Sequence, residues 1–324
     1  MRERIRLFFI LSITFFLALS AISVEAKQSK SNKPSKAELA GISRADTKTN
    51  KDGLLRVASS NALIVNQNTG EVLFAKDTNT LTSIASVTKL MTAMVTLDAN
   101  LPMDEEIAIT NEDVDTLKNS SSKLPVGTVL PRSELLKIAL IASDNRAASA
   151  LGRNYPTGKA GFVNAMNIKA LQLDMTRSEF ADPTGLNNHN MSTAEDLVKM
   201  VKAAYQYPEI REITTTASYE AYVKGHHAPV NFNNTNGLIR KSDWIIGLSK
   251  TGFIQEAGKC LVMQAMISGQ PMIIVLLKSY GSATRSADAN RIRKWIENCL
   301  VAPKDLQLVW LWLYPENLRL AIEL

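Results

Sequence analysis

The C-terminal third of the chain is rich in β-strand formers, and this feature constrains the fold more than any other. Three apolar segments, 244–254, 261–267 and 272–277, are separated only by short polar or glycine-containing breaks. This spacing predicts adjacent antiparallel strands. Near the start of the chain, apolar runs at 62–65 and 71–75 flank a turn signal and predict a hairpin. Strands are therefore expected at both ends of one globular body.

The sequence between these strands has helical periodicity. Leu90, Met91 and Met94 would share one buried face of a helix that starts at Ser86. Further helices are predicted as a pair with a turn over 132–152, singly over 159–173 and 283–299, and from a capping box at 192–195 to residue 204. This order predicts an α+β domain over 55–300, whose antiparallel sheet is completed by the N-terminal hairpin.

Both ends of the chain lie outside this predicted domain. Residues 1–26 combine an arginine-rich start, a long apolar run and a cleavage pattern, which is typical of a secretory signal peptide. An uncleaved membrane anchor is the alternative. Residues 27–54 have few bulky apolar side chains and are predicted to be a flexible basic linker. Residues 301–324 form an apolar tail whose strongest run, 308–313, is too short to span a membrane.

The net charge of +6 resides in the N-terminal segments. Residues 27–51 hold seven Lys or Arg and two acidic residues, and residues 1–26 hold three Arg and two Glu. The rest of the chain is therefore neutral, which gives no support to nucleic-acid binding. We expect the basic linker either to be simply solvated or to associate with anionic lipid or cell-wall polymer.

The first candidate for chemistry is Ser86-Val87-Thr88-Lys89. Residues three apart share a helix face, so the Ser86 hydroxyl and the Lys89 amine can meet. A serine hydroxyl is a poor nucleophile until a base takes its proton, and a desolvated lysine with a lowered pKa can do so. The motif alone is weak, because Ser120-Ser121-Ser122-Lys123 also matches it. We interpret that second match, in a polar stretch without apolar periodicity, as chance.

Two further motifs follow in the chain. Ser143-Asp144-Asn145 lies between two predicted helices, where a hydroxyl could relay a proton and an amide could bind a peptide. Helix N-capping is the simpler interpretation of this triplet alone. Lys250-Thr251-Gly252 interrupts an apolar strand, where a lysine needs a partner and a glycine often marks close approach of a ligand. The alternative for this motif is an exposed edge strand protected by a lysine.

In this order, on helix, loop and strand, the three motifs resemble those of penicillin-binding proteins and class A β-lactamases. Over roughly residues 55–300 the chain resembles the low-molecular-mass DD-peptidases (peptidase family S11), and above all the D-alanyl-D-alanine endopeptidases of the Gram-negative periplasm. The stretches that carry the resemblance are 83–94, 142–148, 182–186 and 248–253. The resemblance implies a β-lactamase/DD-peptidase-like fold with the active site between an antiparallel sheet and a helical cluster.

Position by position, the resemblance makes Ser86 the nucleophile, Lys89 its base and Ser143 the proton relay. Four residues would bind the substrate, namely Asn145, Lys250, Thr251 and Gly252. The oxyanion hole would be the backbone N–H groups of Ser86 and Phe253. The segment 182–186 would either shape the cleft floor or be purely structural. We therefore predict a periplasmic serine DD-endopeptidase that cleaves D-alanyl cross-links of peptidoglycan and is covalently inhibited by β-lactams.

Three other functions compete with this prediction. A β-lactamase needs a residue that directs water onto the acyl-enzyme, and Glu179 with the segment 182–186 does not match the Glu-x-x-Leu-Asn pattern of class A enzymes. A DD-carboxypeptidase would use the same chemistry. Such enzymes usually carry a further β-rich domain and an amphipathic anchor, and the short tail here favours the endopeptidase. A silent wall-binding module is disfavoured because Ser86, Lys89 and Lys250 are intact.

No cofactor or metal is predicted. His189 lies among asparagines, and His226 and His227 are adjacent, so none has the spacing of a zinc peptidase motif. No glycine-rich phosphate loop is present in the sequence. The two cysteines, Cys260 and Cys299, could pair after export or remain free.

Overall fold

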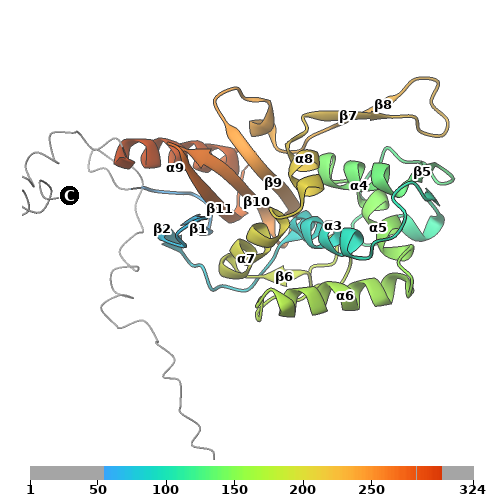
Figure 1. The fold of residues 1–324 in the computed structure, drawn as a ribbon, viewed down its shortest axis with the longest axis horizontal. Helices are drawn as coiled ribbons and strands as arrows, with labels where there is room; N and C mark the ends of the chain where they lie inside the picture. The colour runs from blue at the N-terminus through green and yellow to red at the C-terminus, as the bar shows by residue number, and fades with distance from the viewer. Residues whose placement is uncertain (1–54, 282, 301–324) are drawn as a thin grey trace, which may run out of the picture. The chain divides into compact units, whose positions relative to one another are not determined.

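A five-stranded antiparallel sheet is the frame of the part that the computed structural model describes, residues 55–281 and 283–300 (Figure 1). The strand order is β2-β1-β11-β10-β9. The bounds are Asn61–Asn66 for β1, Val72–Lys76 for β2, Ile245–Ile254 for β9, Gly258–Ile267 for β10 and Gln270–Ser279 for β11. Because β1 pairs with both β2 and β11, the N-terminal hairpin completes the sheet, and the predicted arrangement is confirmed.

Both faces of this sheet are buried. Alternate residues of β11 point in opposite directions. Ile273 and Val275 join the core formed with the helical group, whereas Ile274 and Leu276 pack with the last helix, α9 (Thr284–Leu300). Burial on both faces explains why β9, β10 and β11 are nearly continuous apolar runs in the sequence.

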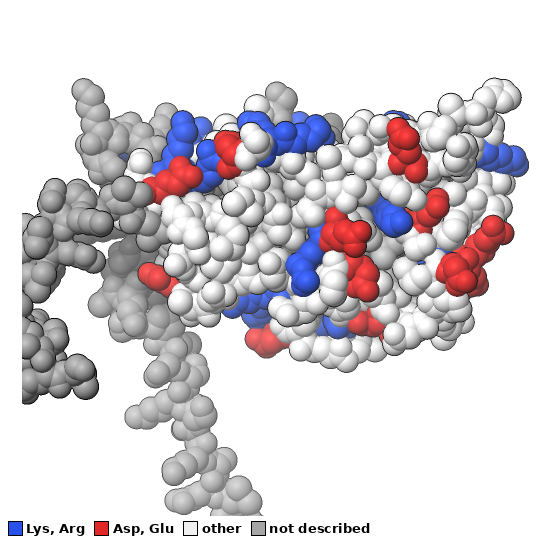
Figure 2. All heavy atoms as spheres, turned by 45° about the horizontal axis from the view of Figure 1, so that its top comes forward, with Lys and Arg blue, Asp and Glu red and all other residues white. Residues whose placement is uncertain are grey.

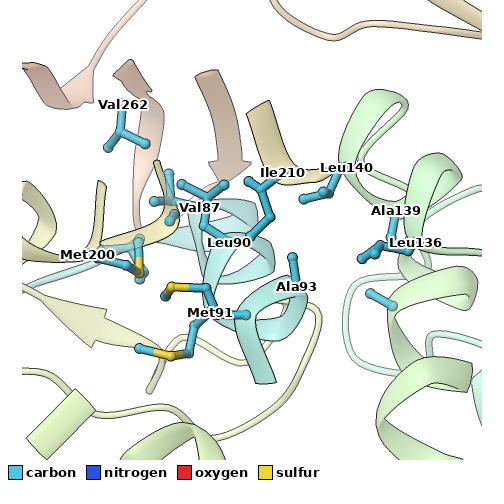
Figure 3. Packing of buried hydrophobic residues seen from close by; sticks show 14 of the residues in the cluster. Val87, Leu90, Met91, Ala93, Leu136, Ala139, Leu140, Met200, Ile210 and Val262 are labelled. Atoms are coloured by element: carbon cyan, nitrogen blue, oxygen red, sulfur yellow. The ribbon is translucent and has the colours of Figure 1, made fainter. Parts of the chain in front are cut away.

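On the face opposite α9, helix α7 packs against β1 and β11, and further helices surround α3 (Figure 1). The bounds are Lys89–Asp98 for α3, Arg132–Ile141 for α4, Asn145–Arg153 for α5, Gly158–Gln172 for α6, Ala194–Ala204 for α7 and Pro208–Thr215 for α8. The short 3-10 turn η1, Ala85–Thr88, leads directly into α3. Figure 3 shows Val87, Leu90 and Met91 surrounded by side chains from β10, α4, α7 and α8. The segment that begins with Ser86 is therefore held rigidly by the core.

The starts of α3 and α7 differ from the predicted ones. The α-helix begins at Lys89 rather than Ser86, because residues 85–88 form the tighter turn η1. The predicted capping box at 192–195 is wrong by one residue. Helix α7 is capped by Thr193, whose hydroxyl accepts a hydrogen bond from the Asp196 N–H at 3.2 Å.

Several short elements were not predicted from the sequence. They are β3 (Thr82–Ser83) with β6 (Met191–Ser192), β4 (Glu106–Ala108) with β5 (Val129–Pro131), β7 (Ser218–Ala221) with β8 (Val230–Asn233), η2 (Asn111–Asp113), η3 (Gly237–Arg240) and the eight-residue helix α8. Strands of two to four residues contain too few positions to show an alternating pattern. Cys260 is buried in β10 and Cys299 is exposed on α9, and both are free thiols.

The predicted signal peptide 1–26, linker 27–54 and tail 301–324 lie outside the described residues. Within 55–281 and 283–300, no helix has both the length and the apolar character needed to cross a membrane. On the face shown in Figure 2, basic and acidic side chains of the described part lie interspersed.

Candidate active site

Ser86 and Lys89 are in direct contact at the junction of η1 and α3. The Lys89 Nζ donates to Ser86 Oγ at 2.8 Å, as the three-residue spacing predicts. It also donates to Asn145 Oδ1 and to the Thr184 carbonyl, each at 2.7 Å. Lys89 is only 1% exposed, while Ser86 is half-buried at the edge of a pocket. A buried amine therefore faces a hydroxyl that remains open to solvent.

Burial changes the acid–base behaviour of Lys89. Desolvation lowers the pKa of Lys89 to about 7, and the charges of Asp182, Asp144 and Asp115 oppose this shift only in part. Near neutral pH a large fraction of Lys89 is consequently an uncharged amine. Such a group can accept a proton from the adjacent hydroxyl.

Ser143 and Lys250 form a second hydroxyl–amine pair. Ser143 lies between α4 and α5 with a φ of 59°, and Lys250 Nζ donates to Ser143 Oγ at 2.8 Å and to the Thr251 carbonyl at 3.0 Å. Lys250 is 2% exposed, and burial, followed by the nearby charges of Lys89 and Arg285, holds the pKa of Lys250 well below its ordinary value.

Both interpretations of the Ser143-Asp144-Asn145 triplet apply. Asp144 is the N-cap of α5, and its carboxylate accepts from the Ala147 N–H at 3.0 Å. This cap fixes the start of α5. Ser143, which precedes Asp144, accepts a hydrogen bond from Lys250, and Asn145, which follows it, accepts one from Lys89. Local helix capping thus positions two predicted site residues.

Strand β9 passes unusually close to the turn that carries Ser86. A Cβ atom on Gly252 would lie 2.7 Å from the Ile84 carbonyl oxygen and 3.1 Å from the Ser86 nitrogen. Only glycine allows this approach without a shift of the backbone. The neighbouring Thr251 bonds through its hydroxyl to Thr235 Oγ1 at 2.7 Å, and Phe253 is 59% exposed at the pocket. The predicted strand motif therefore lies beside the predicted nucleophile.

The segment 182–186 forms part of the same site. The Asp182 carboxylate accepts from the backbone N–H groups of Thr184 and Gly185, each at 2.6 Å, and this tight loop directs the Thr184 carbonyl at Lys89. Gly185 has a φ of 81°, and a Cβ atom there would collide with the Ala85 carbonyl oxygen. Of the two alternatives for this segment, the geometry favours a part of the cleft. The contribution of Thr184 through its backbone could not be recognised from its side chain.

Two pockets adjoin these residues and share Asn145 and Leu186. One, of about 340 Å³, is lined by Ser86, Lys118, Ser120, Asn145, Leu186, Phe253, Ile254 and Gln255. The other, of about 250 Å³, extends beneath the loop 112–117. The larger pocket is the natural place for a substrate, because it exposes the Ser86 hydroxyl.

Ser120 and Arg285 contact the site although neither was predicted as a site residue. Ser120 Oγ accepts from Asn145 Nδ2 at 2.8 Å. The second Ser-x-x-Lys match does not unite its own serine and lysine, because Lys123 Nζ donates to the Asn231 carbonyl at 2.8 Å. Arg285 of α9 donates to the carbonyls of Gly252 and Cys260, both at 3.2 Å, and no local pattern in the sequence links it to β9.

The arrangement is suited to acyl transfer. It combines an accessible hydroxyl that lines a pocket, a buried amine with a lowered pKa bonded to that hydroxyl, and a second hydroxyl–amine pair whose lysine is near enough to Lys89 for their charges to interact. Within residues 55–281 and 283–300, no group of three or more His, Cys, Asp or Glu is arranged to hold a metal ion.

Several known proteins are similar to this chain in sequence or in structure. The family model described as D-alanyl-D-alanine carboxypeptidase, peptidase S11, matches residues 45–281. A D-alanyl-D-alanine endopeptidase of Pseudomonas aeruginosa is 44% identical over 241 residues, which cover 74% of this chain and 78% of that protein. One of Escherichia coli is 41% identical over 247 residues, covering 76% of this chain and 80% of that protein. The solved structure of the Streptomyces K15 DD-transpeptidase aligns with a TM-score of 0.68 at 30% identity, covering 74% of this chain and 97% of that one.

Proposed function

Since this chain belongs to peptidase family S11, the D-alanyl-D-alanine carboxypeptidase family, we propose that it is a serine DD-endopeptidase that cleaves D-alanyl cross-links of peptidoglycan. Two relatives above 40% identity are named endopeptidases, and this supports cleavage of cross-links. A carboxypeptidase of Bacillus subtilis is 30% identical over 72% of this chain. Trimming of a terminal D-alanine is therefore the second candidate activity.

The observation that carries this proposal is the set of hydrogen bonds around Lys89. A neutral lysine amine has two N–H groups and one lone pair. The Thr184 carbonyl and Asn145 Oδ1 can only accept, so they occupy both N–H groups. In this neutral state the hydrogen bond to Ser86 reverses its direction, and the lone pair accepts from the Ser86 hydroxyl across the same 2.8 Å. This is the geometry that a general base requires.

In the proposed first step, Ser86 Oγ attacks the carbonyl carbon of the D-alanyl residue while its proton moves to Lys89 Nζ. The resulting oxyanion would be stabilised by the backbone N–H groups of Ser86 and Phe253, each contributing about 10²–10³ in rate. Ser143, bonded to Lys250, would pass a proton to the leaving amine as the C–N bond breaks. Water would then hydrolyse the Ser86 ester and restore the hydroxyl.

Substrate binding is proposed to involve Asn145, Lys250, Thr251 and Gly252 together with Arg285. Arg285 makes the β9 side of the site basic, and a substrate carboxylate near the scissile amide would favour the charged form of Lys250 there. Asn145 and the edge strand β9 offer polar groups to a peptide backbone. A β-lactam would acylate the same Ser86 hydroxyl and act as a covalent inhibitor.

The domain boundaries and the location are part of the proposal. We infer a signal peptide over 1–26, a linker over 27–54 and a catalytic domain over 55–300 in a periplasmic enzyme. The positive charge of the linker supports association with anionic lipid or wall polymer. Fractionation of cells that express the full chain, with and without a salt wash, would test both inferences.

A fluorescent penicillin tests the chemistry directly. Wild-type protein should become covalently labelled, and Ser86→Ala should not. The matched control is Ser121→Ala, which changes an exposed serine in a loop and should label like wild type. Absence of label on wild type, or label that persists in Ser86→Ala, would contradict the proposed nucleophile. Loss of one D-alanine from an uncross-linked pentapeptide, without cleavage of dimers, would instead establish the carboxypeptidase.

A further inference from the structure

Ser120 lies in the cleft beside Asn145, although the proposed mechanism does not use it. Its hydroxyl lines the pocket that exposes Ser86, and its Oγ lies 2.8 Å from Asn145 Nδ2. The other end of the same amide, Asn145 Oδ1, accepts from Lys89 Nζ at 2.7 Å. One side chain therefore connects Ser120 to the proposed base.

Asp115 holds the loop that carries Ser120 and places a carboxylate near its hydroxyl. Its carboxylate accepts from the backbone N–H groups of Leu117, Lys118 and Ser120 at 2.8, 3.0 and 2.8 Å, so it lies close to the Ser120 side chain. Partial burial acts to raise the pKa of Asp115, but these hydrogen bonds outweigh it and lower that pKa. A charged carboxylate can only accept. With this carboxylate near its side chain, the Ser120 hydroxyl turns its proton away from Asn145, and its lone pairs accept from the Asn145 amide at 2.8 Å.

This direction matters at the proposed base. With its NH₂ group bonded to Ser120, Asn145 presents its carbonyl oxygen to Lys89, and the lone pair of the neutral amine remains free for Ser86. In the reversed amide, the Asn145 NH₂ group would face Lys89 and donate to that lone pair. Ser86 would then compete with Asn145 for the same acceptor.

We propose that Ser120, held by Asp115, is a positioning residue that fixes the orientation of the Asn145 amide and keeps the Lys89 lone pair directed at Ser86. Ser120 acts through Asn145 and need not touch the substrate. The inference rests on the proposed function, because it matters only if Ser86 is the nucleophile. It also gives the serine of the second Ser-x-x-Lys match a role that does not involve Lys123.

The test measures the rate constant of acylation by a fluorescent penicillin in the full chain, with the melting temperature as a check of folding. Ser120→Ala should slow acylation about tenfold, because the partly buried Asn145 NH₂ group would lose its acceptor. Ser120→Thr keeps a hydroxyl and should restore most of the rate. Ser121→Ala, the same substitution at the exposed neighbour, should acylate at the wild-type rate. If Ser120→Ala does not fold, Ser120→Cys replaces the hydroxyl by a weak acceptor of similar size, and it should also be slow.

A double-mutant cycle separates positioning from a general effect of the loop. If Ser120 acts through Asn145, adding Ser120→Ala to Asn145→Ala should slow acylation by less than about twofold. Wild-type acylation in Ser120→Ala, or the same tenfold loss in the Asn145→Ala background, would overturn the inference. Failure of the wild-type chain to label at all would overturn the proposed function itself, and this inference with it.

Discussion

At the scale of single residues, the site is built from groups whose charges are suppressed by burial. Lys89 and Lys250 are almost fully buried, each is bonded to a serine hydroxyl, and each has a lowered pKa. Folding places both lysines where the charged form is costly. This cost is characteristic of active sites, because a lysine with its ordinary pKa is a poor base at neutral pH.

The lowered pKa of Lys89 predicts the pH dependence of acylation. Below its pKa of about 7 Lys89 is protonated in the folded protein and cannot accept the Ser86 proton, so the rate should rise with pH and level off above that value. Lys89→Met, which has similar length but no basic group, should lower the plateau by about 10²–10⁴-fold. Penicillin acylation rates across this pH range check both statements. A flat profile, or a fast Met variant, would contradict the assignment of the base.

At the scale of elements, the site depends on three backbone segments that approach one another closely. The turn η1 carries Ser86, strand β9 touches it at Gly252, and the loop 182–186 touches it at Gly185. At both glycines a Cβ atom would meet backbone atoms of residues 84–86. The geometry around Ser86 is therefore set by glycine contacts between distant parts of the sequence.

The stabilities of Gly185→Ala and Gly70→Ala, compared with each other, separate the effect of a steric clash from that of backbone strain. Its φ of 81° imposes a strain of roughly 1–2 kcal/mol on any other residue. The clash with Ala85 should add about 1–3 kcal/mol and slow acylation as well. Gly70→Ala is the matched control, because Gly70 has a φ of 76° but nothing within 4 Å of a Cβ atom. Equal losses of stability in both variants, with unchanged acylation, would show that the contact is unimportant.

The long elements could be predicted from the sequence, whereas contacts made by loops could not. Strands β9, β10 and β11 have ten residues each and strong apolar runs, and the three motifs sit on elements of the expected type. The Thr184 carbonyl is a backbone group that any residue could supply. Ser120 lies in a polar loop without periodicity, so its place beside Asn145 depends on tertiary packing alone. Arg285 reaches β9 from a helix that begins about thirty residues later in the sequence.

At the scale of the whole molecule, the sheet separates two hydrophobic cores, one on each of its faces. The core shared with α3 supports the turn that carries Ser86, whereas Ala289, Ile292 and Ile296 of α9 pack on the opposite face. The second core stabilises the sheet without contacting the proposed nucleophile. Stability and acylation should therefore respond differently to mutations in the two cores.

Ile292→Ala tests this separation. Ile292 is fully buried, so the truncation should reduce the free energy of unfolding by about 2–5 kcal/mol. Acylation by penicillin, normalised to the folded fraction, should stay within about twofold of wild type because the site lies on the other core. Denaturant unfolding and labelling kinetics provide the two measurements. A large loss of acylation in protein that is fully folded would show that the core under α9, and not Arg285 alone, controls the site.

The proposed activity of this chain is the cleavage of peptidoglycan cross-links through Ser86. The most direct measurement is to incubate the chain, and its Ser86→Ala variant, with purified cross-linked muropeptide dimers and to determine the product masses. We predict that wild type converts dimers to monomers with the gain of one water per cut, and that Ser86→Ala leaves them intact. Dimers that survive wild-type enzyme, or that are cleaved equally by Ser86→Ala, would contradict the account.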